Sequence, residues 1–562
     1  MIEIGTQKFF HASATARRRQ DVINRIRDAE GNWREDIAGI QEVLLEYFRG
    51  IFTSSLPSNQ ELEAVLNTVR PKVMDAMNES LLLPFTEQEC PAYFELWILL
   101  HKMNFTHIVL IPNALNLRSV ISHTHLVFIP GRLITDNVLV TFEINHYVKN
   151  RTRGKSGSSA LKFDISKAYD WVEWGFLRSI LLRLGIHERF VRLNMNFVTS
   201  VTYSLMLNGS QFGYFRPHQG IRQGDPLSPY LFLFVAEAFS CMLQDAENRG
   251  EIQGITISRE APRVSHLLFA NDTIIFEQAR EDTMSAIKWI LIAYGKASGQ
   301  EINLEKSSMV LSQNLGIQER LRLAVILEVA VVERHDKYLG LPTVAGRSRG
   351  ELFRAIKDKM WARIQGWNNK LLSQAGRGVL IKAVLQSIPT YVMSCFRLPN
   401  YLLHEIEMMI AEFWWHNKGE RRTHWLGWSR FCQSRDEGGL GFKEMKAFNQ
   451  VMLAKQGWRL ITRPNALLSQ ILKAKYFHES SFLEASMGSR PSLTWRSLME
   501  ARDLLQQGCR RRIGSNEFTW YYDSKGHFSV RSAYKLEMKI KRRMRPSTSN
   551  SEANEENSER SR

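Results

Sequence analysis

The sequence is poor in cysteine and has none of the cysteine spacings that build small structural sites. It contains five cysteines, an odd number, and no CxxC pair; they are Cys90, Cys241, Cys395, Cys432 and Cys509. A disulfide framework and a zinc ribbon are therefore excluded. Scattered cysteines of this kind are typical of a reduced, intracellular compartment.

Long hydrophobic runs are also lacking. The longest, at residues 231–239, is interrupted by Glu237 and falls well short of the roughly 18–20 residues that a membrane-spanning helix needs. The start of the chain, MIEIGTQKFFHASATARRRQ, has no signal-peptide core, although its basic, Ser- and Ala-containing character leaves a transit peptide as the alternative. No Walker loop, GxGxxG run or Ser-His-Asp order is present. We therefore expect no membrane partner.

What the chain has in excess is positive charge. It carries 74 Lys and Arg against 57 Asp and Glu, a formal net charge of +17, with 44% hydrophobic residues. The hydrophobic content predicts a folded protein. Its length, divided by about 150 residues per domain, predicts three or four domains. The charge favours a polyanionic partner, nucleic acid before a membrane surface.

The composition and the spacing of apolar residues change several times along the chain. The apolar residues Val22, Ile23 and Ile26 recur at helix spacing, and short strand-like runs such as residues 107–111 follow later. The first three expected segments are a helical lead-in at 1–56, a mixed region at 57–150 and an α/β region at 151–315. Basic Trp-containing helices are expected at 316–460, and a C-terminal region at 461–540 with two short strands and a helix start at 518–534. The last segment, 541–562, is expected to be a disordered polar tail.

The α/β region offers two carboxylate positions. Leu161, Phe163 and Ile165 alternate with Lys162 and Asp164, which predicts a half-buried strand with Asp164 on its polar face. A carboxylate at a strand end is a natural Mg²⁺ ligand, and the alternative is a solvated surface residue.

A second carboxylate lies further along the chain. Asn271 and Asp272 occupy a tight turn between apolar strands at 264–269 and 273–276, where Asp272 could meet Asp164. Simple hairpin-turn chemistry is the alternative.

A glycine-rich loop lies between these positions. The run GIRQGDPLSP at residues 220–229 enters a predicted helix at 226–247. Its glycines permit close backbone approach, Gln223 could contact a base or sugar, and the helix N-terminus favours phosphate. The alternative is a structural loop in which Asp225 caps the helix. Upstream of it, Asn208-Gly209 between two apolar runs predicts a hairpin.

Taken together, these segments resemble the polymerase palm of reverse transcriptases. The matching runs are LKFDISKAYDWVEWGFL (161–177), GIRQGDPLSPYLF (220–232), LLFANDTIIF (267–276), GQEINLEKSS (299–308) and YLGLPT (338–343). They closely match reverse transcriptases of plant non-LTR (LINE-type) retrotransposons over roughly residues 130–460. The run GHFSVRSAY resembles the region before a zinc-binding segment of the same family.

The resemblance implies a fold and a domain order. The expected fold is α+β: a right-hand polymerase palm of antiparallel sheet and helices, shortened fingers, and an all-α thumb-like extension. The implied parts are remnant fingers at 57–150, the palm at 151–315, the thumb-like region at 316–460 and a region preceding a zinc-binding segment at 461–540. Basic residues of the thumb-like part, with Trp361 and Trp367 interleaved, either line a nucleic-acid duplex or form a solvated face.

The resemblance also implies an activity and its residues. The expected reaction is RNA-directed DNA synthesis by two Mg²⁺ ions, with RNA template, DNA primer and deoxynucleoside triphosphates as partners and the nucleus as location. The oligomeric state is not fixed. The resemblance implies that the metal ions are bound by Asp164, Asn271 and Asp272, with a backbone oxygen from Ile165. It implies that Tyr169 excludes a ribose 2′-hydroxyl and that Lys306 protonates the departing pyrophosphate. Contacts with the template or nucleotide are implied for Gln223, Gly224 and Arg132.

Two departures from the family pattern predict an impaired enzyme. Asn271 stands where the family has the first aspartate of its paired turn, so one negative charge is lost beside two divalent ions. The stretch between Pro84 and Pro130 is much shorter than the family's fingers. We expect a truncated, partly degenerate copy with at least about 10²–10³-fold lower activity. The alternative is a non-catalytic nucleic-acid-binding remnant.

Overall fold

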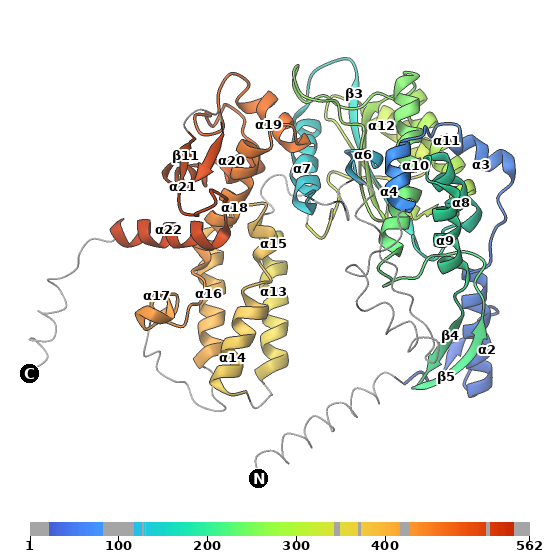
Figure 1. Ribbon diagram of the computed structural model, residues 1–562, viewed down its shortest axis with the longest axis horizontal. Coiled ribbons are helices and arrows are strands. Elements are labelled where there is room, and N and C mark those ends of the chain that lie inside the picture. The colour runs from blue at the N-terminus through green and yellow to red at the C-terminus, as the bar shows by residue number, and fades with distance from the viewer. Residues whose placement is uncertain are drawn as a thin grey trace, which may run out of the picture.

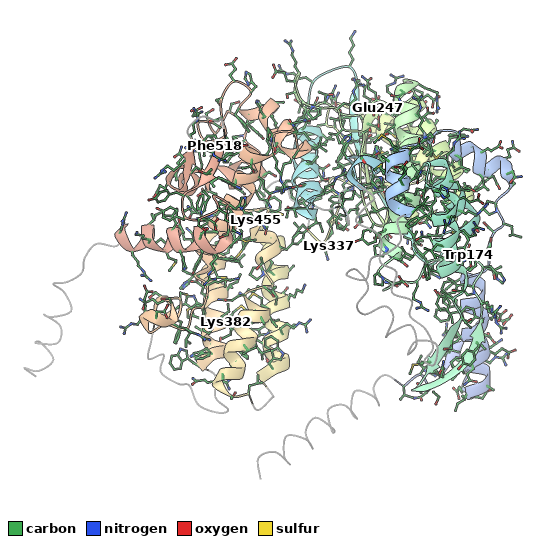
Figure 2. The ribbon with its side chains drawn as sticks, viewed as in Figure 1. Trp174, Glu247, Lys337, Lys382, Lys455 and Phe518 are labelled. Atoms are coloured by element: carbon green, nitrogen blue, oxygen red, sulfur yellow. The ribbon has the colours of Figure 1, made fainter. Side chains whose placement is uncertain are left out.

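A computed structural model describes residues 22–82, 117–125, 129, 131–341, 349–368, 372–415, 427–512 and 517–544. Figure 1 shows two lobes joined at one end, which we call the sheet lobe (22–341) and the helical lobe (349–544). Trp174 and Glu247 lie in the sheet lobe, and Lys382 and Lys455 lie in the helical lobe (Figure 2). The expected α+β class is confirmed, because a palm-type sheet is followed by a region dominated by helices.

The sheet lobe is built on one six-stranded sheet. Its strand order is β10-β9-β3-β7-β6, with β8 paired to β3. The strands are β3 (Gly157–Ser166), β6 (His266–Phe269), β7 (Asp272–Ala279), β8 (Glu301–Ile302), β9 (Ser308–Leu311) and β10 (Ala330–Val331). The predicted strands around residues 161–165, 264–269 and 273–276 are therefore confirmed. The pairing of β3 with β7 is antiparallel, so residues distant in sequence are placed side by side.

Both faces of this sheet are covered, as the apolar residues of its strands require. Leu161, Ile275 and Met309, which pair across β3, β7 and β9, belong to the core beneath the sheet-lobe helices. Their neighbours Ala160 and Phe276 face a second core that continues into the helical lobe. The sheet-lobe helices are α3 (Asn59–Leu66), α4 (Asp75–Leu82), α6 (Leu117–Val120), α7 (Ile134–Asn150), α8 (Trp174–Arg183), α9 (Glu188–Thr199), α10 (Ser228–Asn248), α11 (Glu281–Ser298) and α12 (Ile317–Leu327).

Helix α7 joins the two lobes and is buried along most of its length. Its carboxylates are consequently paired: Asp136 accepts two hydrogen bonds of 2.6 Å from Arg459, and Glu143 accepts from Lys475 at 2.9 Å. The helical-lobe elements are α13 (Arg349–Asn368), α14 (Gln374–Leu380), a π-helical turn (Ile381–Leu385), α15 (Thr390–Met393), α16 (Asn400–Trp415), α17 (Trp428–Phe431), α18 (Met445–Thr462), α19 (Leu467–Tyr476), α20 (Leu493–Met499), α21 (Arg502–Gly508), β11 (Cys509–Arg511), β12 (Phe518–Trp520) and α22 (Val530–Met544).

Local turn chemistry is confirmed where glycine or asparagine takes a positive φ. Strands β4 (Tyr203–Leu207) and β5 (Ser210–Phe215) form the predicted hairpin, with φ of 51° at Asn208 and 91° at Gly209. A helical lead-in before residue 37 is wrong for the described part, because β1 (Ile26–Arg27) pairs with β2 (Trp33–Arg34) around a turn. Helix α2 (Ile37–Ile51) follows.

The C-terminal expectations need two corrections. Residues 518–534 contain one strand rather than two, since the partner of β12 is β11, which comes earlier in the chain. Helix α22 runs past residue 541, where a disordered tail was expected, because Lys541 and Arg542 pair with Glu444 and Glu437. The expected strand at 107–111, the stretch 83–116 of the shortened fingers and residues 545–562 lie outside the described residues. None of the described helices is long and apolar enough to cross a membrane.

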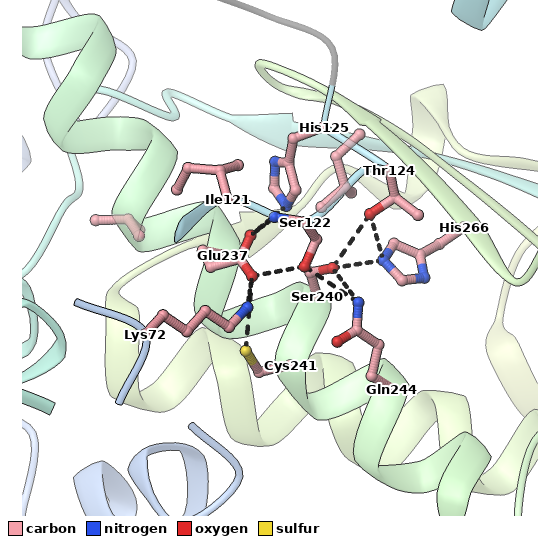
Figure 3. A network of polar contacts seen from close by, with 12 residues as sticks. Lys72, Ile121, Ser122, Thr124, His125, Glu237, Ser240, Cys241, Gln244 and His266 are labelled. Carbon is pink, nitrogen blue, oxygen red and sulfur yellow. Dashed lines mark hydrogen bonds and ion pairs between the residues drawn. The ribbon is translucent and has the colours of Figure 1, made fainter. Parts of the chain in front are cut away.

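A buried polar network fixes α10, the helix that follows the glycine-rich loop. Figure 3 shows Glu237 at its centre. This carboxylate is fully buried and accepts hydrogen bonds from the Ser122 backbone N–H at 2.9 Å and the Ser122 hydroxyl at 2.6 Å, and it pairs with Lys72. Burial lowers the pKa of His125 and His266 to about 3, so both imidazoles are neutral. Lys72 is therefore the cation that compensates Glu237.

Removal of Lys72 tests this compensation. We expect Lys72→Met to lower the free energy of unfolding by about 2 kcal/mol or more, because it leaves a buried carboxylate without its counter-ion. The measurement is the midpoint of urea unfolding of the whole chain. The matched control is Lys288→Met, which breaks the exposed Lys288–Glu328 pair and should cost at most about 1 kcal/mol. The double variant Lys72→Met/Glu237→Gln should recover much of the loss; a loss as large as in the single variant would contradict the assignment.

A second buried carboxyl lies at the far end of β7. Burial raises the pKa of Glu277 well above its ordinary value. Its Oε2 accepts a 2.6 Å hydrogen bond from the Gln253 N–H, and its Oε1 has no hydrogen-bond partner among the described residues. A raised folded-state pKa means that the folded chain keeps the proton when the unfolded chain has lost it. This contribution to the free energy of unfolding is fully present below the pKa that Glu277 has in the unfolded chain. It is lost as pH rises through the higher pKa that Glu277 has in the folded chain.

The variant Glu277→Gln should remove this dependence. We expect the wild-type unfolding free energy to fall, relative to that of the variant, as pH rises from the ordinary pKa range of a glutamate through neutral pH, because the variant cannot ionise at this position. Urea midpoints of both proteins across this range measure the difference. Glu333→Gln, at an exposed site, is the control and should parallel the wild type. Parallel curves for Glu277→Gln and the wild type would refute the prediction.

Candidate functional site

The register of β3 and β7 brings the two predicted carboxylates together. Asp164 pairs directly with Asp272 across the antiparallel ladder, and Asn271 occupies the turn before β7. The Asn271 Nδ2 lies 3.3 Å from Asp164 Oδ1, and the Ile165 N–H donates to the Asn271 carbonyl at 3.1 Å. Residues 107 positions apart thus form one polar group at the end of the two strands.

Two lysines face these carboxylates. The Lys162 Nζ lies 3.4 Å from Asp272 Oδ1, and the Lys306 Nζ lies 4.0 Å from Asp164 Oδ2. Burial raises the pKa of Asp272 above its ordinary value, although Lys162 opposes this shift. Lys306, for which the resemblance implies a proton-donor role, thus lies beside Asp164.

Lys162 was not predicted as part of the site. Its signal is the alternation that places it on the same face as Asp164, two residues away. Its contact with Asp272 follows only from the register of β3 and β7.

The donor set offers few free oxygen ligands for divalent cations. Carboxylate oxygens are the ligands that Mg²⁺ prefers. Asp164 and Asp272 supply two carboxylates, but Asn271 presents its amide nitrogen to Asp164, and each carboxylate is already faced by a lysine. In the part of the chain that the structure describes, no cluster of three or more His, Cys, Asp and Glu side chains could hold a metal.

The Tyr169 ring is held in place by a neighbouring aromatic side chain. It stacks on Phe232 of α10, with ring centroids 5.1 Å apart and an interplanar angle of 17°. Its carbonyl accepts a 2.8 Å hydrogen bond from the Ile221 N–H, which ties the loop after β3 to the glycine-rich loop. The structure therefore joins the first two of the predicted segments.

The glycine-rich loop has the backbone freedom that its glycines predict. Gly220 has φ of 92°, and a Cβ there would lie 2.6 Å from the Asp170 carbonyl oxygen. Gly224 also has φ of 92°, and Gln223 and Gly224 are both exposed. Asp225 Oδ1 accepts a 2.8 Å hydrogen bond from the Leu227 N–H, which closes a turn before α10, but α10 begins at Ser228 without a side-chain cap, so the capping alternative is wrong for Asp225. A cavity of about 530 Å³ opens beside this loop.

The Arg132 guanidinium bonds to backbone carbonyl oxygens of this chain, whereas the predicted role requires it to contact a nucleotide. Its guanidinium donates to the carbonyl of Ser122 at 2.6 Å, to that of His125, and to that of Ile121 at 3.3 Å. These contacts hold the turn at 121–125 together. Nucleotide binding by Arg132 stays a prediction.

The basic helices of the helical lobe give a mixed outcome. On α13, Lys357 pairs with Glu405 at 3.1 Å, and Trp361 is about half exposed, whereas Trp367 packs against Phe413. One tryptophan thus belongs to the core and one remains at the surface.

Comparisons with known proteins agree with this geometry. A family model described as "Reverse transcriptase (RNA-dependent DNA polymerase)" matches residues 108–343. An uncharacterized mitochondrial protein of Arabidopsis thaliana is 44% identical over 135 residues, covering 24% of this chain and 88% of that protein. A retrovirus-related Pol polyprotein from the type-1 retrotransposable element R2 of Popillia japonica is 27% identical, covering 30% of this chain.

The chain spans only 26% of the length of that Pol polyprotein. A solved telomerase from Candida tropicalis, in complex with a fragment of telomeric RNA, aligns at 13% identity and a TM-score of 0.27, covering 79% of this chain and 63% of that one. With the family match over the sheet lobe and the paired carboxylates within it, the chain belongs to the reverse transcriptase family, and its relatives include plant proteins and the Pol proteins of non-LTR retrotransposons.

Proposed function

We propose that the sheet lobe is the RNA-directed DNA polymerase domain of a non-LTR retrotransposon, with activity strongly reduced in this chain. The observation that carries the proposal is the direct pairing of Asp164 with Asp272 across β3 and β7. Its partners would be an RNA template, a DNA primer and deoxynucleoside triphosphates, and its place of action the nucleus.

The reaction joins a nucleotide to the primer. The primer 3′-oxygen attacks the α-phosphorus of the incoming triphosphate, and the bond to pyrophosphate breaks. Divalent ions, when bound by Asp164 and Asp272, supply charge neutralisation at the reacting phosphate. Lys306, beside Asp164, gives a proton to the departing pyrophosphate.

The remaining residues position and select the substrates. Tyr169 is held by its stacking on Phe232, so its ring presents fixed bulk against a ribose 2′-hydroxyl. Gln223 and the Gly224 backbone are exposed and open to contact by the template or nucleotide. The Ile165 backbone lies beside Asp164 at the end of β3.

The expected impairment follows from charge. Two divalent ions carry four positive charges, and the two lysines near the site offset the two carboxylates. Replacement of a third carboxylate by the neutral Asn271 leaves no excess negative charge to hold the ions. Each 1.4 kcal/mol of lost stabilisation costs about tenfold in rate, so a reduction of about 10²–10³-fold or more is expected.

A second candidate is a nucleic-acid-binding remnant without catalysis. The observation that favours it is the same set of contacts: Lys162 and Lys306 compensate the acidic pair without a metal ion. The net charge of +17 serves binding in either case.

Primer extension separates the two candidates. We expect purified Asn271→Asp to extend a DNA primer on an RNA template about 10²-fold or more faster than the wild type, because the added carboxylate restores metal affinity. Asp164→Ala should be inactive. The measurement is Mg²⁺-dependent incorporation of labelled nucleotides.

Asn196→Asp is the matched control, since it adds the same charge at an exposed position of α9 and should leave the wild-type rate unchanged. RNA binding without synthesis in every variant would favour the remnant. Robust synthesis by the wild type would refute the impairment.

A further inference from the structure

Helix α22 carries a stripe of basic residues far from the polymerase site in sequence. Arg531, Lys535, Lys539 and Arg543 recur every four residues and are all exposed, whereas Ala533, Leu536 and Glu537 of the same helix are buried. Side chains at this spacing lie on one side of a helix, about 6 Å apart and about 18 Å from end to end. We call these four residues the α22 stripe.

The stripe has no compensating carboxylates among the described residues. The other basic residues of the helix are paired, Lys541 with Glu444 and Arg542 with Glu437, whereas no member of the stripe forms an ion pair with a residue that the structure describes. Like charges at i and i+4 destabilise a helix. Among the described residues the helix therefore bears an electrostatic cost here that a bound polyanion would relieve.

Exposed aromatic residues adjoin the start of this helix. Tyr521 is 66% exposed and Tyr522 39% exposed, directly after β12. The Tyr522 ring contacts Trp520, with centroids 6.0 Å apart, and the Trp520 Nε1 donates to Ser532 Oγ in the first turn of α22. Buried Trp520 thus anchors the tyrosines beside the helix.

Further positive charge lies on the neighbouring strand. The Arg510 guanidinium lies 5.4 Å from the Tyr521 ring centroid, and that of Arg511 lies 5.6 Å from the Phe518 centroid. The nearby Asp523 carboxylate accepts from the backbone N–H groups of Lys525 and His527 and so closes the turn.

We propose that β11, the 521–527 turn and the α22 stripe form a second nucleic-acid-binding surface, specific for single-stranded RNA. The stripe contacts phosphates, and Tyr521 and Tyr522 stack on unpaired bases. The two tyrosines favour single-stranded over double-stranded RNA, because the bases of a duplex stack on one another and leave no free face for an aromatic side chain. The surface lies outside the family match at 108–343. The inference deepens the proposed function by adding a place to hold the RNA outside the polymerase site.

The charge part is tested by fluorescence anisotropy with a labelled oligouridine, without nucleotides. We expect Arg531→Gln/Lys535→Gln/Lys539→Gln to raise the Kd about tenfold or more and to reduce the slope of log K against log salt by about 2, since each phosphate contact contributes about 0.7. The control Arg189→Gln/Arg192→Gln/Arg322→Gln removes three exposed charges from the sheet lobe and should leave both values near those of the wild type. Equal effects of the two triple variants would overturn the proposal.

The aromatic part is tested with Tyr521→Leu. We expect about fivefold or more loss of affinity for oligouridine and no change for an RNA duplex. Tyr401→Leu, at a position 58% exposed on α16, is the matched control and should bind both as the wild type does. Unchanged oligouridine binding, or an equal loss for duplex, would overturn the stacking assignment. Thermal unfolding of each variant confirms that it is folded.

Crosslinking locates the RNA directly. An oligonucleotide containing 4-thiouridine should crosslink to peptides that contain Tyr521 or Tyr522, identified by mass spectrometry. Crosslinks confined to the sheet lobe, or preferential binding of polyglutamate over oligouridine, would overturn the proposal. Because these measurements use no nucleotides, a failure of DNA synthesis by Asn271→Asp leaves their outcome unaffected, and the two proposals fail separately.

Discussion

The antiparallel register between β3 and β7 is the constraint on which the site depends. Because Asp164 pairs with Asp272 in this register, the turn at Asn271, Lys162 and Lys306 all gather around the same strand ends. A shift of one residue would move each side chain to the opposite face of the sheet. The register is protected by burial, since Leu161, Ile275 and Met309 pack on one face while Ala160 and Phe276 pack on the other. The chemistry of the strand ends is thus held in place by apolar residues that take no part in it.

The sequence predicts what local patterns determine. Alternation around Asp164 and the Asn208-Gly209 turn identify strands correctly, since each rests on neighbouring residues. Features that depend on distant partners were missed: the pairing of β12 with β11, the continuation of α22 through Lys541, and the contacts of Arg132 with the 121–125 turn. At residues 22–36, apolar spacing favoured a helix, but Gly31, with φ of 86°, closes a turn between two short strands instead. The roles of the site residues rest on their proximity, which the sequence implied only through family resemblance.

The site and the α22 surface differ in how their charges are balanced. At the strand ends, each carboxylate has a lysine close by, so the group is nearly neutral without any ligand. Along α22, four cations stand without partners among the described residues. The nearly neutral strand ends attract divalent ions weakly, whereas the uncompensated cations along α22 attract a polyanion. Weaker binding of divalent ions at the strand ends would therefore leave the positive charge along α22 unchanged.

The position of α7 has a consequence for how the chain can be divided. Its two buried ion pairs, Asp136 with Arg459 and Glu143 with Lys475, belong to a core that includes one face of the sheet and the helices after residue 349. A fragment cut at the limits of the family match would keep α7 over that face of the sheet but would remove the helices that pack on the other side of α7, and would leave two carboxylates without their cations. The two lobes therefore share their buried contacts along α7, and separating them would expose apolar residues and unpaired charges on that helix to water.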